Sequence, residues 1–447
     1  MKQPENAIIA FGHAIKNNPQ HREALLRKGE AHISTRQLAE AKQCFETVLE
    51  SAPEEPNSLC TLGELLRKTG EGEKALEFTK KVLKANPQTV VAHLVAARAE
   101  VSLKKYDEAE KRLSGMLKRH ANSAIKAASA KLLGDVHEAK GDYETAFENY
   151  RVGQETSESH NRTRIDEAGV MSGFDRRLTM LDQVDVSGWG AIDDGLPNPV
   201  FLLGVPRTGI TLVEHMLCGH PKVVTSNQRG FLADTVLSIG NHVELDKEYP
   251  ECLTDLDDEA VKKLRKSYWN RVDQYIPDRG DRTLVDRTPM SIGDAMFIRR
   301  LFPAAPVVHM IRDPRDACLS CFSEVLDFNH VTVLFSQLER SARVYGKLAE
   351  LGIKATEKLG MNELEVRYEN LVEGFDEAKK IVNHMGLEWD AAQEDFVKVA
   401  WDRYILDLAG EAAFELSTES VGRWKKYESK LAGVTQLLAP LVSHYGY

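Results

Sequence analysis

Residues 200–217 read VFLLGVPRTGITLVEHML, and this stretch decides the fold of the second half of the chain. Its first five residues form an apolar run with the length and composition of a strand buried in a parallel sheet. A short loop with Pro206 and Gly209 follows, and apolar residues then recur at helical spacing. We therefore expect a strand, a tight loop and a helix, within an α/β fold that has a parallel sheet.

The loop between the expected strand and helix has the features of an anion-binding site. The first N–H groups of a helix lack intrahelical partners and lie at the positive end of the helix dipole. Gly209 lets the backbone approach a ligand closely, and Arg207 supplies a fixed positive charge. Thr208 and Thr211 add hydroxyl donors. An ordinary structural turn uses the same residue types, so the loop alone leaves both interpretations open.

A second strand and helix are expected in residues 306–320, which read PVVHMIRDPRDACLS. Pro314 is well placed near the start of that helix. Arg312 at the end of the strand and Ser320 about two turns into the helix are both placed to reach one phosphate. The alternative is an ordinary salt bridge between Arg312 and Asp316 at the helix start.

Together these motifs resemble those of the sulfotransferases that use 3′-phosphoadenosine 5′-phosphosulfate (PAPS). GVPRTGITL at 204–212 is similar to the family's 5′-phosphosulfate loop, and RDPRDACLS at 312–320 is similar to its 3′-phosphate-binding strand and helix. Further segments also resemble the family: DRTP at 286–289, RYENLV at 367–372 and VGRWKKY at 421–427. The resemblance is closest to the branch with tyrosylprotein sulfotransferases and bacterial sulfotransferases that carry tetratricopeptide repeats. It implies a P-loop-like sulfotransferase fold, with a parallel sheet flanked by helices.

The resemblance also implies which residues bind the nucleotide. Contacts with the 5′-phosphosulfate are implied for Arg207, Thr208, Gly209, Ile210, Thr211 and Leu212. The 3′-phosphate is implied to lie on Arg312 and Ser320, and later contacts are implied for Tyr368 and Arg423. No metal ion is implied, because a sulfuryl group carries less charge than a phosphoryl group.

The implied catalytic residues are Arg207, Arg287 and Gln228. Arg207 is implied to lie near the leaving oxygen. Arg287 stands where the family has a Lys that stabilises the transferring sulfuryl group, and this change keeps the charge but alters reach and donor geometry. Gln228 stands where the family branch has a Glu that acts as general base, and an amide has no useful basicity. His220 and Asp234 are the nearest alternative bases in the sequence.

The first third of the chain repeats with a period of 34 residues. Two sets of residues follow this period: Pro19, Pro53 and Pro87, and Ala41, Ala75 and Ala109. Paired helices with small residues at the crossing and Pro after the second helix are typical of tetratricopeptide repeats. We expect an all-α repeat array over 1–155, a helical connector and linker over 156–197, and the sulfotransferase domain over 198–447. The first unit lacks its first helix, so the chain is a fragment or starts unusually.

Composition and charge exclude several classes of protein. The 447 residues are 42% hydrophobic and 28% charged, with a net charge of −10, whereas nucleic-acid binders are more often basic. No apolar run approaches the ~20 residues of a membrane-spanning helix, and the first residues lack a signal-peptide layout. We therefore expect a soluble, cytoplasmic protein without a membrane partner. Cys318 and Cys321 form a CxxC without a second pair at metal-ligand spacing, so neither metal nor redox chemistry is expected.

The function expected from these observations is sulfuryl transfer from PAPS to a hydroxyl or amine, which leaves adenosine 3′,5′-bisphosphate (PAP). Catalysis would come from positioning and from cations near the leaving phosphate. One alternative is a non-catalytic nucleotide-binding and protein-interaction module, favoured by Gln228; another is a nucleotide kinase, disfavoured because the loop lacks Gly-Lys-Ser/Thr. Protein tyrosine, carbohydrate and small metabolites remain open as acceptors. The repeats are expected to bind a protein or peptide partner, or to self-associate.

Overall fold

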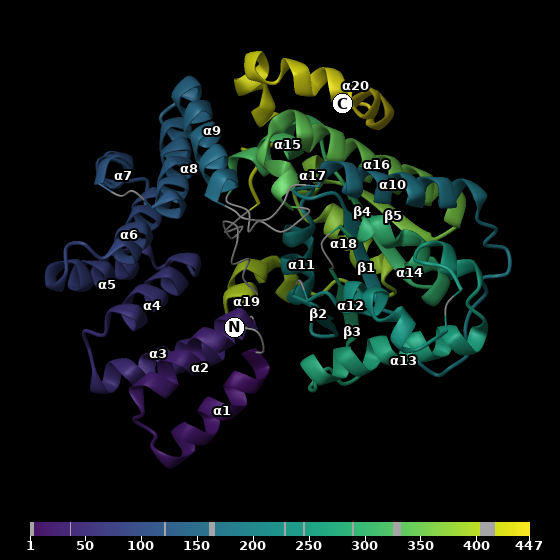
Figure 1. Cartoon of the computed structure of the whole chain (residues 1–447), viewed down its shortest axis with the longest axis horizontal. Helices are drawn as coiled ribbons and strands as arrows, with labels where there is room; N and C mark the ends of the chain where they lie inside the picture. Colours follow the sequence, from purple (N-terminus) through teal and green to yellow (C-terminus); the bar gives the residue numbers. More distant parts are fainter. Residues whose placement is uncertain are drawn as a thin grey trace. The chain divides into compact units, whose positions relative to one another are not determined.

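The structure is a computed structural model that describes most of the chain. The described residues are 4–35, 37–119, 122–160, 166–227, 229–244, 246–287, 290–324, 332–402 and 416–447. They form two compact units (Figure 1). The repeat unit contains the described residues up to 160, Ser323–Glu324 and residues 400–402, and the sheet unit contains the other described residues.

The repeat unit consists of consecutive helices joined by short turns (Figure 1). The helices are α1 (Pro4–Asn17), α2 (Arg22–Ser34), α3 (Leu38–Ser51), α4 (Pro56–Lys68), α5 (Gly72–Ala85), α6 (Val90–Ser102), α7 (Tyr106–Arg119), α8 (Ser123–Ala139) and α9 (Tyr143–His160). Each helix packs on the next along the chain, because two amphipathic helices bury their apolar faces against each other.

Small residues allow the repeat helices to approach closely, as the sequence predicts. Three alanines of the 34-residue period are fully buried: Ala41, Ala75 and Ala109. A Cβ atom on Gly29 would lie 2.8 Å from the ring of Phe45, so only glycine fits at that crossing. The three prolines of the period lie in turns between helices: Pro19, Pro53 and Pro87. The predicted repeat array is confirmed.

The sheet unit is built on a five-stranded parallel sheet with the order β2-β3-β1-β4-β5. The strands are β1 (Val200–Gly204), β2 (Val223–Thr225), β3 (Thr283–Asp286), β4 (Pro306–Ile311) and β5 (Asn362–Arg367). Leu202 of the central strand β1 lies opposite Val308 of β4. Every residue of β1 is buried, which explains its continuous apolar run. The predicted fold class, a parallel α/β sheet behind an all-α repeat array, is confirmed.

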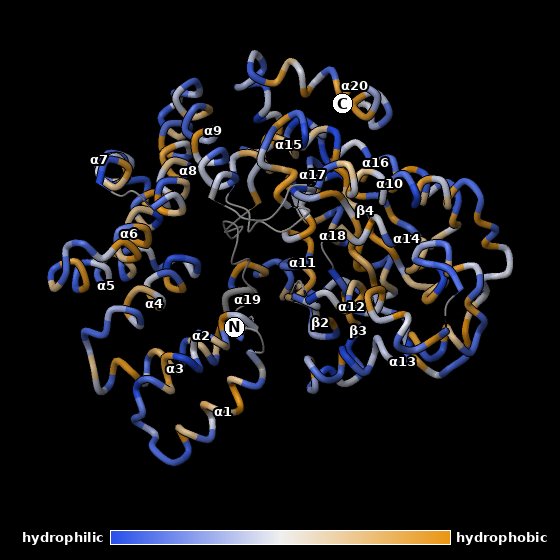
Figure 2. The backbone as a smooth tube through the Cα atoms, in the orientation of Figure 1, coloured by the Kyte–Doolittle hydropathy of each residue, from blue (hydrophilic) through white to orange (hydrophobic). Residues whose placement is uncertain are grey.

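Helices connect the strands, as parallel pairing requires. The connecting helices are α11 (Ile210–Cys218), α12 (Phe231–Leu237), α13 (Asp258–Tyr275), α14 (Ala295–Leu301), α15 (Pro314–Ser323) and α16 (Leu338–Leu359). Helix α10 (Glu167–Gln183) precedes β1, and β5 is followed by α17 (Tyr368–Leu371), α18 (Asp376–His384), α19 (Phe396–Asp402) and α20 (Ala432–Tyr445). Hydrophobic residues gather in and around the strands of this unit (Figure 2). No helix among the described residues is long and apolar enough to cross a membrane.

The parallel sheet brings the ends of its strands together at one edge. The chain leaves β1 into the loop 205–209, β3 at Arg287, β4 at Arg312 and β5 at Tyr368. Because the carboxyl ends of parallel strands share an edge, ligands of open α/β sheets bind there. The two motifs that the sequence singles out, which lie about a hundred residues apart, therefore meet on the same side of the sheet.

Candidate functional site

The loop after β1 has a backbone that requires glycine at two positions. Gly209 caps α11 with φ of +94°, and a Cβ atom there would lie 2.6 Å from the ring of Tyr368. At Gly204 a Cβ atom would lie 2.7 Å from Thr208 Oγ1. Arg207 also has a positive φ, +71°, which is uncommon outside glycine and is found where surrounding structure enforces it. These constraints fold residues 204–209 into a tight turn against the start of α11.

The hydroxyl groups of Thr208 and Thr211 make hydrogen bonds within the protein. Thr208 is buried, and its hydroxyl donates to the carbonyl of Val205 at 2.8 Å, so it holds the turn together. The hydroxyl of Thr211 accepts a hydrogen bond from Arg287 at 2.6 Å. Ile210 and Leu212 belong to the first turn of α11. The α11 amino terminus thus presents a compact loop at which helix N–H groups are available to an anion.

The structure brings the two predicted phosphate motifs into direct contact. Arg207 Nε donates to Ser320 Oγ of α15 at 2.9 Å. Arg312 Nη1 donates to the main-chain carbonyl of Arg207 at 3.0 Å. Two guanidinium groups and a hydroxyl from separate strand–helix units therefore form one cationic cluster at the carboxyl edge of the sheet.

Arg312 is buried and held by three different groups. Besides its bond to the loop, Nη2 donates to the carbonyl of Ser420 at 2.7 Å, and the guanidinium lies 4.3 Å from the ring centre of Tyr368. The Arg312 side chain is among the buried polar groups, and its Nε is a buried donor without a hydrogen-bond partner among the described residues. A buried unsatisfied donor costs about 1–3 kcal/mol, so an acceptor atom of a ligand would stabilise this site.

Asp316 fixes the C-terminal segment that contains Arg423. Its carboxylate accepts from the N–H groups of Gly422 at 2.6 Å and Trp424 at 2.7 Å. Burial raises the pKa of this carboxyl, and the two N–H groups act in the opposite direction. The salt bridge to Arg312 considered from the sequence is replaced by these main-chain bonds. Arg315, one residue before Asp316, stacks on the Trp424 ring at 3.9 Å.

Arg287 enters the site from β3 and is anchored by main chain and side chain. Its N–H donates to Ser226 Oγ at 2.9 Å. Its guanidinium donates to Thr211 Oγ1 and, at 3.1 Å, to Glu214 Oε2 on α11. Sequence reasoning found Arg287 but missed Glu214. The available signal was a lone charged residue among apolar residues of the helix, at helical spacing from Thr211.

The groups considered as general base differ in their availability. Gln228 lies outside the described residues. The structure disfavours His220 as an alternative, because its Nδ1 accepts from the N–H of Lys222 at 3.0 Å and its Nε2 is bonded to the carbonyl of Glu388 at 2.9 Å. With both ring nitrogens engaged in the fold, it has no lone pair for an acceptor proton. Desolvation raises the pKa of the Asp234 carboxyl on α12 and outweighs the opposite effect of the nearby Arg271.

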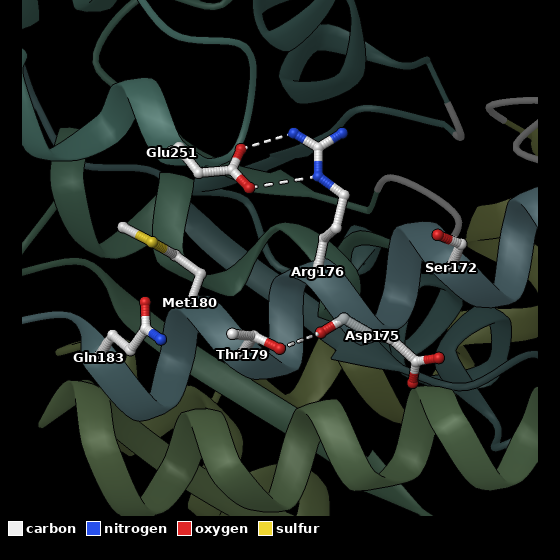
Figure 3. Close-up of a pocket in the computed structure, with 7 residues that line it drawn as sticks. All are labelled: Ser172, Asp175, Arg176, Thr179, Met180, Gln183 and Glu251. Atoms are coloured by element: carbon white, nitrogen blue, oxygen red, sulfur yellow. Dashed lines mark hydrogen bonds and ion pairs between the residues drawn. The ribbon is translucent and has the colours of Figure 1, made fainter.

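Two other features are not part of this cluster. A surface pocket of about 250 Å³ is lined by Ser172, Asp175, Arg176, Thr179, Met180, Gln183 and Glu251 (Figure 3). An ion pair between Arg176 and Glu251 at 2.6 Å occupies its wall, and none of the predicted site residues lines it. Cys318 and Cys321 are buried in α15, and burial raises the pKa of the Cys318 thiol well above its usual value. A thiol held neutral in this way is a poor nucleophile.

Different protein-family models match the two parts of the chain. Residues 199–391 match the model described as "Sulfotransferase family". Two models described as "Tetratricopeptide repeat" match residues 1–59 and 94–159. A model described as "Anaphase-promoting complex, cyclosome, subunit 3" matches residues 34–116.

Several proteins are similar to this chain over different shares of its length. An uncharacterized protein of Aquifex aeolicus (strain VF5) is 22% identical over 436 residues, which are 95% of this chain and 56% of that protein. Protein-tyrosine sulfotransferase A of Caenorhabditis elegans is 24% identical over 206 residues, 44% of this chain and 53% of that protein. The chain thus spans just over half the length of these relatives. The structure of sulfotransferase STF9 from Mycobacterium avium aligns with a TM-score of 0.34 at 13% identity, over 76% of this chain and 96% of that one.

Proposed function

We propose that this chain transfers a sulfuryl group from PAPS to a hydroxyl or amine acceptor, because residues 199–391 match the sulfotransferase-family model and residues 1–59 and 94–159 match tetratricopeptide-repeat models. The observation that carries the proposal is the meeting of Arg207, Ser320 and Arg312 at the carboxyl edge of the sheet. One cationic cluster built from two strand–helix motifs suits a nucleotide with phosphate groups at both the 3′ and the 5′ position.

The residues present fit such a nucleotide. The loop 205–209 and the first N–H groups of α11 suit the 5′-phosphosulfate, because Gly209 leaves no side chain over the helix end. The buried Nε of Arg312 and the hydroxyl of Ser320 suit the 3′-phosphate. In this proposal Ile210, Thr211 and Leu212 line the first site, and Tyr368 and Arg423 add contacts to the nucleotide.

Sulfuryl transfer breaks the bond between sulfur and the bridging oxygen of the 5′-phosphate, and the electron pair stays on the phosphate of PAP. A new bond forms between sulfur and the acceptor oxygen or nitrogen, and the acceptor proton passes to a base or to water. Arg207 is placed to stabilise charge on the leaving phosphate, and Arg287 to stabilise the group in transfer. Asp234 is the group that we propose to take the proton in place of Gln228.

Binding of nucleotides tests the first part of the proposal. Calorimetry on the full chain is expected to show PAP bound more tightly than AMP, which lacks the 3′-phosphate, and more tightly than ATP. A charge-assisted contact to the 3′-phosphate is worth about 2 kcal/mol, or roughly 30-fold in affinity. Equal affinity for PAP and AMP would contradict the assignment of the 3′-phosphate site.

Turnover tests the second part. Full-length protein with PAPS labelled in the sulfuryl group is expected to transfer label to an activated phenol, whose pKa is well below that of an alcohol. Tight PAP binding without label transfer to phenols, alcohols, amines or water would instead support a nucleotide-binding module, the reading that Gln228 favours.

A further inference from the structure

A carboxylate is buried in α11, directly behind the phosphate loop. Only 1% of the Glu214 side chain is exposed, and its helix neighbours Val213, Met216 and Leu217 are fully buried. Burying a carboxylate costs several kcal/mol unless it is paired, so its presence in an apolar helix calls for a partner. Glu214 lies three residues after Thr211, which places both side chains on one face of α11.

One partner of Glu214 is Arg287, and the arginine is held from two sides. Its Nη1 donates to Glu214 and its Nη2 to Thr211, while its main-chain N–H donates to Ser226. The terminal nitrogens of a guanidinium are fixed relative to each other, so two anchors fix the plane of the group. A lysine ammonium has no such fork. The two side-chain bonds use two of the five N–H groups of an arginine, and the group remains a donor for a ligand.

We infer that Glu214 is a positioning residue, which orients Arg287 for sulfuryl transfer and balances its charge. The inference rests on the proposed function, in which Arg287 faces the transferring group. A donor that is fixed before the reaction stabilises the transition state more than a mobile one. The pairing with a carboxylate also weakens the pull of Arg287 on an anionic nucleotide in the ground state. Glu214 therefore speeds transfer and weakens nucleotide binding at the same time.

The substitution Glu214→Gln tests this inference, because the amide has nearly the same shape but no charge. We expect the single-turnover rate of label transfer from PAPS to 4-nitrophenol or to water to fall about 10- to 100-fold, the size of effect that a misplaced group produces. We expect PAP to bind about threefold or more tighter in calorimetry, because the charge of Arg287 is no longer balanced. Single-turnover conditions separate transfer from slower release of PAP.

Two further variants serve as controls. Glu363→Gln makes the same chemical change at another hydrogen-bonded glutamate of the sheet unit, where Glu363 Oε1 lies 2.8 Å from His309 Nδ1 at the start of β5. It should leave transfer rate and PAP affinity within about twofold of wild type, since β5 begins at the opposite edge of the sheet. Glu214→Asp keeps the charge with a shorter reach, and should restore PAP affinity and part of the rate.

The outcomes separate this inference from the proposed function. Failure of the wild type to bind PAP would contradict the proposed function before any variant is compared. Transfer by Glu214→Gln at the wild-type rate would overturn the inference. A parallel loss of transfer rate and PAP affinity would also overturn it, because such a loss indicates only structural damage. If the Gln variant does not fold, Glu214→Asp must lower the rate at unchanged PAP affinity. If the wild type binds PAP but shows no turnover, the inference is tested by PAP affinity alone. Binding of PAP by Glu214→Gln that is no tighter than that of the wild type would then overturn it.

Discussion

Arg312 contacts three segments of the chain through one side chain. It donates to the carbonyls of Arg207 and Ser420 and lies over the ring of Tyr368. The sequence predicted a phosphate ligand here from the position of Arg312 at the end of a strand. The sequence could not predict the contacts of Arg312 with main-chain carbonyls. Every residue has such a carbonyl, and the fold alone determines which of them lies near Arg312.

Substitution of Arg312 should separate binding of the 3′-phosphate from binding of the rest of the nucleotide. Arg312→Ala is expected to weaken PAP by on the order of 2 kcal/mol or more, because a charge-assisted contact is lost. AMP affinity should change little by comparison. Calorimetry with both nucleotides checks this, and equal losses would show that Arg312 acts only by holding the loop and Ser420 in place.

Gln228 gives a prediction that depends on the sequence alone. Restoring a carboxylate with Gln228→Glu should raise transfer to alcohols more than to phenols, because loss of a general base typically costs about 10²–10⁴-fold and matters most for weakly acidic acceptors. The measurement is label transfer from PAPS across acceptors of rising pKa. No gain at any acceptor pKa, with PAP affinity intact, would place the base elsewhere, and Asp234→Asn would then be the variant to examine.

Site residues that belong to recognisable sequence motifs could be predicted. Residues whose role depends on a partner that is distant in the sequence could not. Arg207 and Ser320 stand in recognisable motifs, and the structure joins them at 2.9 Å. Sequence reasoning missed Glu214, because the periodicity of α11 identifies a buried face but does not show which buried residue forms an ion pair. For Asp316 the sequence offered only a local salt bridge as an alternative, since its acceptor role toward Gly422 and Trp424 depends on a segment about a hundred residues away.

The element that organises the site is the unit of β1, its loop and α11. Its strand was predicted with the observed limits and its helix without them, because a continuous apolar run and helical spacing are strong signals for the presence of each element. The short strands β2 and β3 were not identified, since three or four residues carry too little pattern. The order of the strands in the sheet could not be predicted either, because it depends on pairing between segments that are distant in the sequence.

Gly209 should be the least replaceable residue of this element. Gly209→Ala places a methyl group 2.6 Å from Tyr368 at a positive φ, so the turn must distort. We expect PAP binding to fall at least tenfold and the unit to lose about 1–3 kcal/mol of stability. Gly346→Ala in α16 is the control, because nothing lies within 4 Å of its added Cβ atom. It should stabilise by about 0.5–1 kcal/mol. Calorimetry and thermal melting distinguish the two, and equal behaviour would contradict the strained turn.

At the scale of the whole molecule, the 34-residue period revealed the repeats and the loop motifs revealed the second unit. The sequence assigned residues 156–197 to a connector, whereas α10 packs against α16 within the sheet unit. Two ion pairs support this packing, Lys354 with Asp182 and Arg343 with Glu167, each at 2.7 Å. Helical spacing gives the length of such a helix but not the surface on which it packs.

We propose that the sheet unit binds nucleotide without the repeats, which would then serve a protein or peptide partner or self-association. A fragment of residues 166–447 should fold and bind PAP within about threefold of the full chain, since the site residues all lie in that unit. A fragment that starts at 198 is the control, and it should be less stable because α16 loses its contact with α10. A folded fragment of 166–447 that does not bind PAP would show that the repeats contribute to the site.

The Nε of Arg312 has no hydrogen-bond partner among the described residues, so a bound phosphate should stabilise the folded sheet unit. The resulting rise in melting temperature can be measured without knowing which compound accepts the sulfuryl group. A ligand that binds only the folded chain at 100 times its dissociation constant adds about 2.7 kcal/mol of stability. For a domain of 150–250 residues, each kcal/mol shifts the melting temperature by about 2–4 °C. PAP should therefore raise the transition of the sheet unit by about 5–10 °C, and AMP by clearly less at the same concentration. A library of adenine nucleotides ranked by this shift would identify the natural donor, whatever compound receives the sulfuryl group.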